Sequence, residues 1–328
     1  MAKLHIFNPD HDYALSVGIN VYVSPRKIKK IAEALELIPI FWSGKEDYIL
    51  KADNTVVRMK DGKNLRVSEI AEEIMTVVPW GWDHSLVMRL RALGLKENLF
   101  PAREQLIEMQ RLSHRRISID LNRALDFEKI PRECFSLEEA ADFLAETGYA
   151  FFKAPWSSSG RGIVNSRRMP EENLFAWIKG IINKQGSVMA EYGAEKQLDC
   201  ATLWDITDNR VEFIGFSISD VDDKGQYLGN YSAPQSELKK RIREISAEDL
   251  DALVEEQKRF VEEKIMPFHH GPLGIDMIVD TTGKIWPGIE INLRNTMGRA
   301  ALAFQRFIEK NGKTMVPEKL NSLFLRLK

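Results

Sequence analysis

The sequence predicts a mixed α/β fold in three parts, and the first part should contain a partly parallel sheet. In the first hundred residues, short apolar runs alternate with helical patterns, which is typical of a sheet whose strands are joined by helices. A long polar helical stretch begins at about residue 103. From about residue 187, expected strands follow one another with fewer helices between them.

Each expected element has its own signal. The expected strands are KLHIF (residues 3–7), LIPIFW (37–42), TVVPW (76–80), YAFFKAPW (149–156), SVMAEYG (187–193), CATLWDI (200–206), RVEFIGFSIS (210–219), LGIDMIVD (273–280) and KIWPGIEIN (284–292). In SPRKIKKIAEALEL, Ser24 is a suitable N-cap and Pro25 takes the first helical position, where a missing N–H costs no hydrogen bond. Ser136 and Glu139 form a capping box for a helix that Gly148 ends.

Composition excludes several classes of protein. The chain has 328 residues with 44% hydrophobic content and a formal net charge of −2, so no surface for nucleic acid is expected. The two cysteines, Cys134 and Cys200, stand far apart, which argues against a disulfide framework and favours a reducing compartment. No apolar run is long enough to span a membrane, and the first residues lack the apolar core of a signal peptide. We therefore expect a cytoplasmic protein.

Two strands near the end of the sequence carry acids on one face. Because side chains alternate along a strand, Ile289 and Ile291 should face the core while Glu290 and Asn292 share the other face. The same alternation turns Asp276 outward on the preceding strand. Two carboxylates and an amide oxygen are suitable ligands for a hard cation such as Mg²⁺. The alternative is a solvated strand face, where acids are common.

An apolar strand that ends in Lys153 leads directly into SSSGRG, residues 157–162. Small residues allow backbone N–H groups to approach phosphates closely, and a lysine can add a point charge. The loop offers Ser157, Ser158, Ser159, Gly160 and Gly162 as N–H donors and Arg161 as a mobile cation. The alternatives are an ordinary flexible loop and a lysine that extends from a strand end to solvent.

Taken together and in this order, these motifs resemble the nucleotide site of the ATP-grasp superfamily. That site has a strand ending in lysine, a Gly/Ser-rich loop, a hinge strand with glutamate, and a late Asp followed by Glu-x-Asn. Here they are Lys153, SSSGRG, MAEYG, Asp276 and EINLR, within residues 103–300. The resemblance implies an N-terminal α/β domain (1–102) followed by two ATP-grasp lobes with antiparallel sheets, at 103–190 and 191–328.

The resemblance also implies roles in ATP binding. Lys153 would bind phosphate, and the following loop, with Ser158, Ser159, Gly160, Arg161 and Gly162, would close over the phosphates. Backbone groups around Glu191 and Tyr192 would contact the adenine edge. Asp199 would hold the ribose hydroxyls, although the superfamily more often has glutamate there.

Metal binding and catalysis follow from the same resemblance. Asp276, Glu290 and Asn292 would hold Mg²⁺, or Mn²⁺ in its place. Arg294, with Arg161 from the loop, would stabilise charge on the transferred phosphoryl group.

Two features depart from the superfamily pattern. SHRR stands where a first lysine is usual, so Arg115 or Arg116 should replace it. Pro287 and Gly288 interrupt the last strand, and a bulge is expected before Glu290.

The resemblance implies an ATP- and Mg²⁺-dependent ligase. It would activate the carboxylate of a small molecule or peptide as an acyl phosphate, which an amine or thiol then attacks. A small-molecule kinase on the same fold and a nucleotide-binding module without turnover are the alternatives. No partner in the form of nucleic acid or membrane is expected, and the sequence carries no signal for an oligomeric state.

Two further segments are candidates for substrate contacts. NPDHD, with Asp10, His11 and Asp12, follows the first strand and has the composition of an exposed acidic turn, which is the favoured interpretation. The loop with Asn230, Tyr231 and Ser232 is the candidate for the acceptor side.

Overall fold

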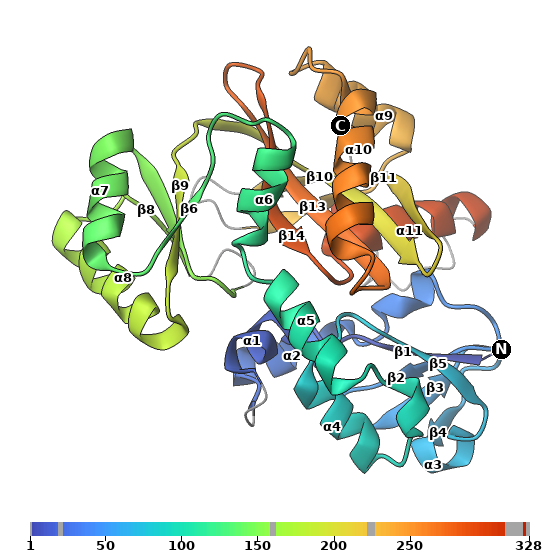
Figure 1. Ribbon diagram of the computed structural model, residues 1–328. Coiled ribbons are helices and arrows are strands. Elements are labelled where there is room, and N and C mark those ends of the chain that lie inside the picture. Colours follow the sequence, from blue (N-terminus) through green and yellow to red (C-terminus); the bar gives the residue numbers. More distant parts are fainter. Residues whose placement is uncertain (1, 19–21, 158–161, 222–226, 312–323, 326–328) are drawn as a thin grey trace.

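The computed structural model describes residues 2–18, 22–157, 162–221, 227–311 and 324–325, and these residues form three β-sheets (Figure 1). The first sheet has the strand order β4-β3-β2-β1-β5, and β1 runs parallel to both of its neighbours. Its strands are β1 (Ala2–Ile6), β2 (Tyr48–Leu50), β3 (Thr55–Arg58), β4 (Asn64–Arg66) and β5 (Ile74–Pro79). The helices of this part are α1 (His11–Val17), α2 (Arg26–Leu35), α3 (Val67–Ile70) and α4 (His84–Ala92), with short 3-10 turns η1 (Ile38–Phe41) and η2 (Glu97–Leu99). The prediction of a partly parallel first sheet is confirmed.

One expected strand of this part is wrong. Residues 37–42 form the 3-10 turn η1 instead of a strand, with Pro39 at its first turn. Proline has a fixed φ and no N–H to donate to a sheet, so the apolar run packs its side chains into the core through a turn. Ile38 and Phe41 are both buried there.

The second part is a four-stranded antiparallel sheet in the order β6-β9-β7-β8. Its strands are β6 (Arg132–Cys134), β7 (Ala150–Lys153), β8 (Ile163–Asn165) and β9 (Val188–Tyr192), and its helices are α7 (Leu137–Thr147) and α8 (Glu171–Gln185). One half of the predicted capping box is confirmed, since Ser136 accepts a hydrogen bond from the Glu139 amide, whereas the Glu139 carboxylate accepts from the Phe135 amide. The predicted stop is confirmed, since Gly148 adopts the left-handed conformation after α7. Phe143 and Phe152 lie at the centre of this small core.

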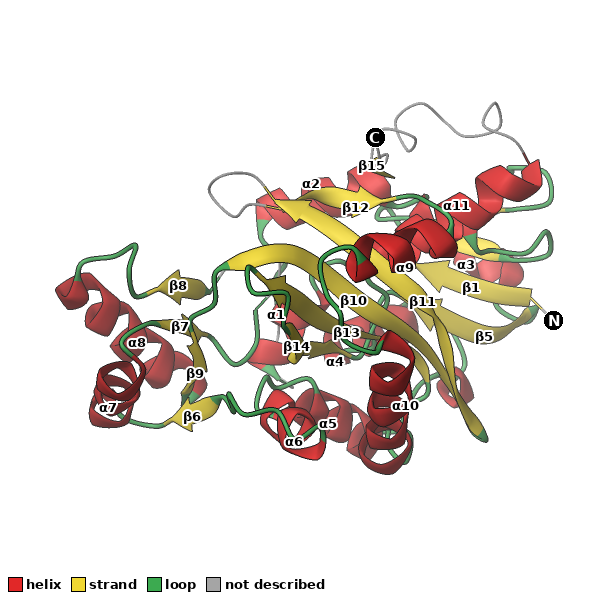
Figure 2. Cartoon of the chain, turned by 90° about the horizontal axis from the view of Figure 1, so that it is seen from above, coloured by secondary structure: helices red, strands yellow, loops and turns green. Residues whose placement is uncertain are grey.

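The third part is a six-stranded sheet in the order β14-β13-β10-β11-β12-β15. Its strands are β10 (Lys196–Thr207), β11 (Arg210–Val221), β12 (Tyr227–Tyr231), β13 (Gly271–Asp280), β14 (Ile285–Asn292) and β15 (Phe324–Leu325). Its helices are α6 (Ile117–Ala124), α9 (Gln235–Arg243), α10 (Leu250–Phe260) with the π-turn η3 (Val261–Ile265), and α11 (Met297–Asn311). Helix α5 (Arg103–Leu112) connects the first part to this one, and its Leu106 and Met109 pack against Val87 of α4. Side chains of α6, α9 and α10 bury one sheet face around Trp204. Figure 2 shows α6 and α10 on the same side of this sheet. Within the described ranges, each helix is too short or too polar to cross a lipid bilayer.

The expected continuous helical stretch from residue 103 to 125 is two helices. The chain turns between Leu112 and Ile117, where the ring nitrogen Nδ1 of His114 accepts a hydrogen bond from the Arg116 amide at 2.9 Å. A side chain that satisfies a backbone N–H lets the helix break without an unpaired donor. The break sends Arg115 toward the interior.

The first and third parts share a core. Ala300, Ala301 and Phe304 of α11 pack against apolar side chains of the first part, which are Phe7, Ile38, Phe41 and Trp80. Asn295 adds two hydrogen bonds, from its backbone N–H to the Trp80 carbonyl at 2.7 Å and from its side chain to the Pro79 carbonyl at 3.2 Å. The carboxyl end of β5 is therefore held beside the segment that follows β14.

A glycine after β9 sets a test of this fold. A Cβ added at Gly193 would lie 2.1 Å from the Tyr149 ring, whereas one added at Gly180 in α8 meets nothing within 4 Å. We predict that Gly193→Ala lowers the free energy of unfolding by about 1–3 kcal/mol through overpacking. Gly180→Ala should raise it by about 0.5–1 kcal/mol, because alanine favours helix. Urea denaturation of both variants checks this, and equal midpoints would contradict it.

Candidate functional site

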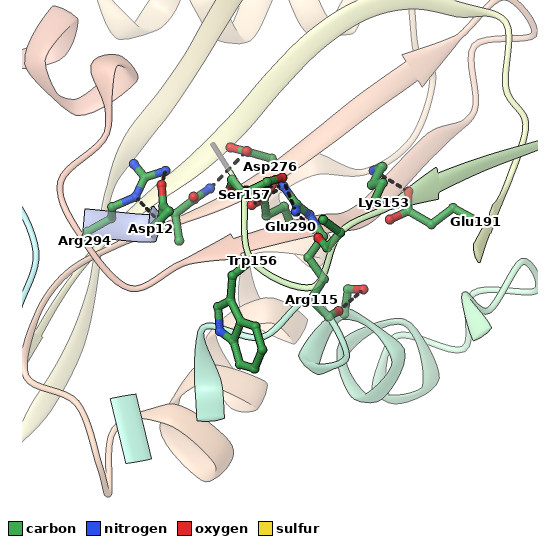
Figure 3. Close-up of polar contacts among 12 residues, drawn as sticks. Asp12, Arg115, Lys153, Trp156, Ser157, Glu191, Asp276, Glu290 and Arg294 are labelled. Carbon is green, nitrogen blue, oxygen red and sulfur yellow. Dashed lines mark hydrogen bonds and ion pairs between the residues drawn. The ribbon is translucent and has the colours of Figure 1, made fainter. Parts of the chain in front are cut away.

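Acidic side chains gather on the face of the six-stranded sheet opposite to its main core. Asp276 on β13 stands directly across from Glu290 on β14, and Gly274 stands across from Asn292. The Asn292 amide donates a hydrogen bond to Asp276 Oδ2 at 3.0 Å. Asp199 on β10 lies on the same face, two residues from the partner of Asp276. The structure thus brings the three expected metal ligands together (Figure 3).

The predicted bulge before Glu290 is confirmed. After the pair Asp276 and Glu290, the next pair is Ile278 with Trp286, so β14 carries two more residues than β13 between them. The freed carbonyls do not stay unpaired: that of Pro287 accepts from Gln257 Nε2 at 2.8 Å, and that of Gly288 accepts from Asn122 Nδ2 at 2.7 Å. Buried carbonyls need such partners. The bulge is therefore a built feature of the site.

The bulge also explains one wrong expectation. Ile291 is buried in the core, as predicted, but Ile289 is only half-buried and lines a small cavity beside Tyr192. Strict alternation along a strand fails where extra residues are inserted. Because the two-residue alternation of side chains does not continue across the bulge, it gave the wrong burial for Ile289.

The carboxyl pair is electrostatically strained. Burial, and then the neighbouring Glu290 carboxylate, raises the pKa of Asp276 to about 7, although Arg294 and the Asn292 amide oppose the shift. A divalent cation would relieve this repulsion, and two carboxylates with an amide oxygen are ligands that Mg²⁺ accepts. Among the described residues, no group of three or more His, Cys, Asp or Glu side chains could hold a metal ion alone. Further oxygen ligands would have to come from a bound substrate or water.

Arg115 is the arginine that reaches the site. Its Nη2 donates to both carboxylate oxygens of Glu290 at 2.8 Å, and its Nη1 donates to the Ala154 carbonyl at 2.5 Å and to Ser157 Oγ at 2.7 Å. Its side chain is only 3% exposed. Arg116 instead lies near the surface and pairs with Glu133 at 3.1 Å. Of the two candidates, only Arg115 contacts other predicted site residues.

Lys153 and Glu191 form a second buried ion pair. Lys153 Nζ lies 2.5 Å from Glu191 Oε2, and both side chains are less than a tenth exposed. The other oxygen of Glu191, Oε1, is buried and has no hydrogen-bond partner among the described residues. Unpaired buried acceptors are costly, which makes this oxygen available to a ligand's donor.

The base of the phosphate loop is well defined. The Ala154 amide donates to the Gly162 carbonyl at 2.8 Å, and Gly162 adopts a φ of 74°, where a Cβ would lie 3.0 Å from the Ser157 Cβ. A left-handed residue in that space has to be glycine. Ser158, Ser159, Gly160 and Arg161 lie outside the described residues.

The remaining predicted nucleotide contacts lie at the edge of this region. The Tyr192 ring packs edge-on against Phe143, so its side chain contributes to the core of the second part. Asp199 forms an ion pair with Lys196.

On the acceptor side, the three candidate side chains all bond to other parts of the protein. Tyr231 donates to Asp220 at 2.9 Å and Ser232 donates to Gln305 at 2.9 Å, while Asn230 donates to the Ile218 carbonyl at 3.3 Å.

For Asp12, the favoured interpretation of an exposed acidic turn is wrong. Instead of an exposed turn, Asp12 reaches Arg294, with Oδ1 accepting from Nε at 3.0 Å and Oδ2 lying 2.8 Å from Nη2. Burial alone would raise the pKa of Asp12, but the Arg294 guanidinium outweighs this and holds it below its usual value. His11 beside it is 2% exposed. The alternative interpretation, a substrate contact at the carboxyl end of a parallel strand, fits this position better.

No protein-family profile matches the chain. Among curated proteins, it is similar to the [butirosin acyl-carrier protein]–L-glutamate ligase of Niallia circulans, with 30% identity over 166 residues. The match covers 49% of this chain and 37% of the relative, so the chain spans little more than a third of that protein.

Solved structures establish the fold. The biotin carboxylase of Campylobacter jejuni aligns with 79% of this chain and 58% of its own at 17% identity, with a TM-score of 0.52. The pyruvate carboxylase of Rhizobium etli aligns with 79% of this chain and 24% of its own at 16% identity, with a TM-score of 0.50. The chain has the ATP-grasp fold, as the order of its motifs predicted.

The strained carboxyl pair gives a prediction with a definite sign. Because the pKa of Asp276 is raised in the folded protein, its charge opposes folding, and stability falls as pH rises from about 4 to about 7. At pH 8 without divalent metal, Asp276→Asn should raise the free energy of unfolding by roughly 1 kcal/mol or more. Urea denaturation in EDTA measures this.

The control is Asp205→Asn, which changes a carboxylate that pairs with Arg299 at 2.7 Å and stands four residues along β10 from the partner of Asp276. It should lower stability or leave it unchanged. A loss of stability at pH 8 in Asp276→Asn would contradict the assignment of electrostatic strain to this pair.

Proposed function

We propose that the chain is an ATP- and Mg²⁺-dependent ligase. It activates the carboxylate of a small molecule or peptide as an acyl phosphate for attack by an amine or a thiol. One observation carries the proposal: the cations Arg115 and Lys153 converge with the carboxylates Asp276 and Glu290 beside the base of a glycine-containing loop (Figure 3). A cytoplasmic location is part of the same proposal, supported by two free, buried cysteines.

The comparisons support this class of reaction. The N. circulans relative is named as a ligase that acts on L-glutamate and an acyl-carrier protein, and the C. jejuni structure is a complex with β-γ-ATP. A ligase of this kind needs positioning and charge neutralisation more than it needs a nucleophilic side chain. The charged side chains of the site match that need.

The nucleotide would lie between the four-stranded sheet and the six-stranded sheet. Backbone groups around Glu191 and Tyr192, with the unpaired Glu191 Oε1, would face the adenine edge, and Asp199 would hold the ribose. Lys153, at the end of β7, would contact the phosphates, because Glu191 already holds its ammonium group in position. The loop residues 158–161 keep their role from the sequence analysis as a cover for the phosphates.

Phosphoryl transfer would take place at the other end of the site. Asp276, Glu290 and Asn292 would hold the metal, and Arg115 keeps the Glu290 carboxylate in its present orientation. When bound, ATP supplies the phosphoryl group and Mg²⁺ neutralises its charge. Arg294, fixed by Asp12, would stabilise charge that develops on the transferred group.

Nucleotide binding is the first test. Millimolar ATP with Mg²⁺ should raise the melting temperature, because a ligand that binds only the folded state stabilises it. Lys153→Ala should reduce that shift, whereas Lys179→Ala, an exposed lysine on α8, should not. Scanning fluorimetry measures the shift. If ATP leaves the native melting curve unmoved, the nucleotide site is wrongly assigned.

Turnover is the second test and separates the reaction classes. With pooled amino acids, dipeptides and dicarboxylates, a ligase should release ADP and form hydroxamate when hydroxylamine replaces the acceptor. Glu290→Gln should lower that rate by about 10²-fold or more with little change in ATP affinity, since the lost charge acts mainly in the transition state. Phosphorylated product without free phosphate would instead indicate a kinase. Equal turnover in Glu290→Gln would contradict the metal assignment.

A further inference from the structure

Three ion pairs follow one another along the site in Figure 3. Lys153–Glu191 lies at the nucleotide end, Arg115–Glu290 lies in the middle, and Arg294–Asp12 lies at the opposite end. The group that receives the phosphoryl should lie beyond the metal ligands, on the side away from the adenine contacts. Asp12 and Arg294 are therefore the charged residues on the substrate side.

Asp12 has capacity for a further partner. Arg294 donates a hydrogen bond to Oδ1 and forms an ion pair at Oδ2, whereas an ionised carboxylate offers about four acceptor positions. Both side chains are about 15% exposed, so they are partly desolvated. A partly desolvated carboxylate such as that of Asp12 favours a ligand group with a positive charge.

A small cavity beside Asp12 has the size and lining for an ammonium group. It is lined by Asp12, Ser113, Trp156, Glu290, Asn292 and Leu293 among others, and it has room for about one water-sized group. Ser113 Oγ is fully buried and has no hydrogen-bond partner among the described residues. An unpaired hydroxyl next to a carboxylate offers oxygen acceptors to a donor with several N–H bonds. A primary ammonium group has about the volume of a water molecule and carries three such donors.

We propose that this cavity binds the ammonium group of the acid substrate, and that the substrate class is therefore the amino acids. The ammonium would bind Asp12 and Ser113, while the carboxylate to be activated would lie toward Arg294 and the metal ligands. This inference rests on the proposed ligase function, which it makes more specific.

The ammonium group bound here is not the attacking amine. An attacking amine has to lose its proton, and an ionised carboxylate stabilises the protonated form instead. Asp12 stays ionised because Arg294 holds it so. The cavity thus recognises the acid, and the acceptor has to approach from another side.

The test uses matched ligands and binding alone. The probes are the twenty standard L-amino acids and D-alanine, each compared with its N-acetyl derivative, in the presence of Mg²⁺ and a non-hydrolysable ATP analogue. We expect at least one amino acid to raise the melting temperature in a saturable way and to bind about tenfold or more tightly than its N-acetyl form. If no amino acid binds, or if an N-acetyl form binds equally well, the inference is overturned.

Two variants test whether Asp12 and Ser113 are the residues that discriminate between an amino acid and its N-acetyl form. Asp12→Asn should reduce the affinity ratio between the amino acid and its N-acetyl form to about one or two, and Ser113→Ala should reduce it about threefold. Asp205→Asn, which changes a second Asp–Arg pair that does not line this cavity, should keep the full ratio. An unchanged ratio in Asp12→Asn contradicts the assignment. The Ser113 variant and the ligand pairs keep the test valid even if Asp12→Asn fails to fold.

Failure of the ammonium subsite and failure of the proposed ligase function would give different results. Amino-acid binding without ADP release or hydroxamate would overturn the ligase function and leave the ammonium subsite in place. Hydroxamate formation from a dicarboxylate that lacks an amino group, undiminished in Asp12→Asn, would overturn the subsite and leave the ligase function in place.

Discussion

The buried guanidinium of Arg115 joins three segments that are far apart in the sequence. It contacts both oxygens of Glu290 on β14, the Ala154 carbonyl after β7 and Ser157 at the base of the loop. A buried charge costs several kcal/mol unless it is well paired, so each of these contacts has to form together. The helix break turns Arg115 inward, and the loop base and the bulged strand place Ser157 and Glu290 where they pair with it.

The same principle extends along the whole site. Lys153 is paired with Glu191 and Arg294 with Asp12, so each of the three cations has an acid partner before any ligand binds. Such pairing fixes side chains in position, which is how a protein prepares charges for a reaction. Asp276 differs, because its nearest charged neighbour across the strand is another carboxylate. The negative charge that remains marks the place where a cation is most stabilising.

Local signals in the sequence were sufficient for most of the fold and part of the site. Strand alternation placed Asp276, Glu290 and Asn292 on one face, and Pro287 with Gly288 indicated the bulge. The choice between Arg115 and Arg116 was not available, because it depends on a helix break that a histidine side chain supports. The pairing of Asp12 with Arg294 was not available for a similar reason. Its partner Arg294 lies 282 residues away, and only the shared core of α11 and the first part brings them together.

A crystal structure of the chain with Mg²⁺ and a non-hydrolysable ATP analogue would show whether the paired charges of this site hold a metal and a nucleotide. We expect a metal ion about 2.0–2.1 Å from carboxylate oxygens of Asp276 and Glu290, with analogue phosphates completing its ligands and Lys153 in contact with them. Arg115 should keep its contact with Ser157. A nucleotide bound elsewhere, or a metal ion held without either carboxylate, would show that the site is wrongly assigned.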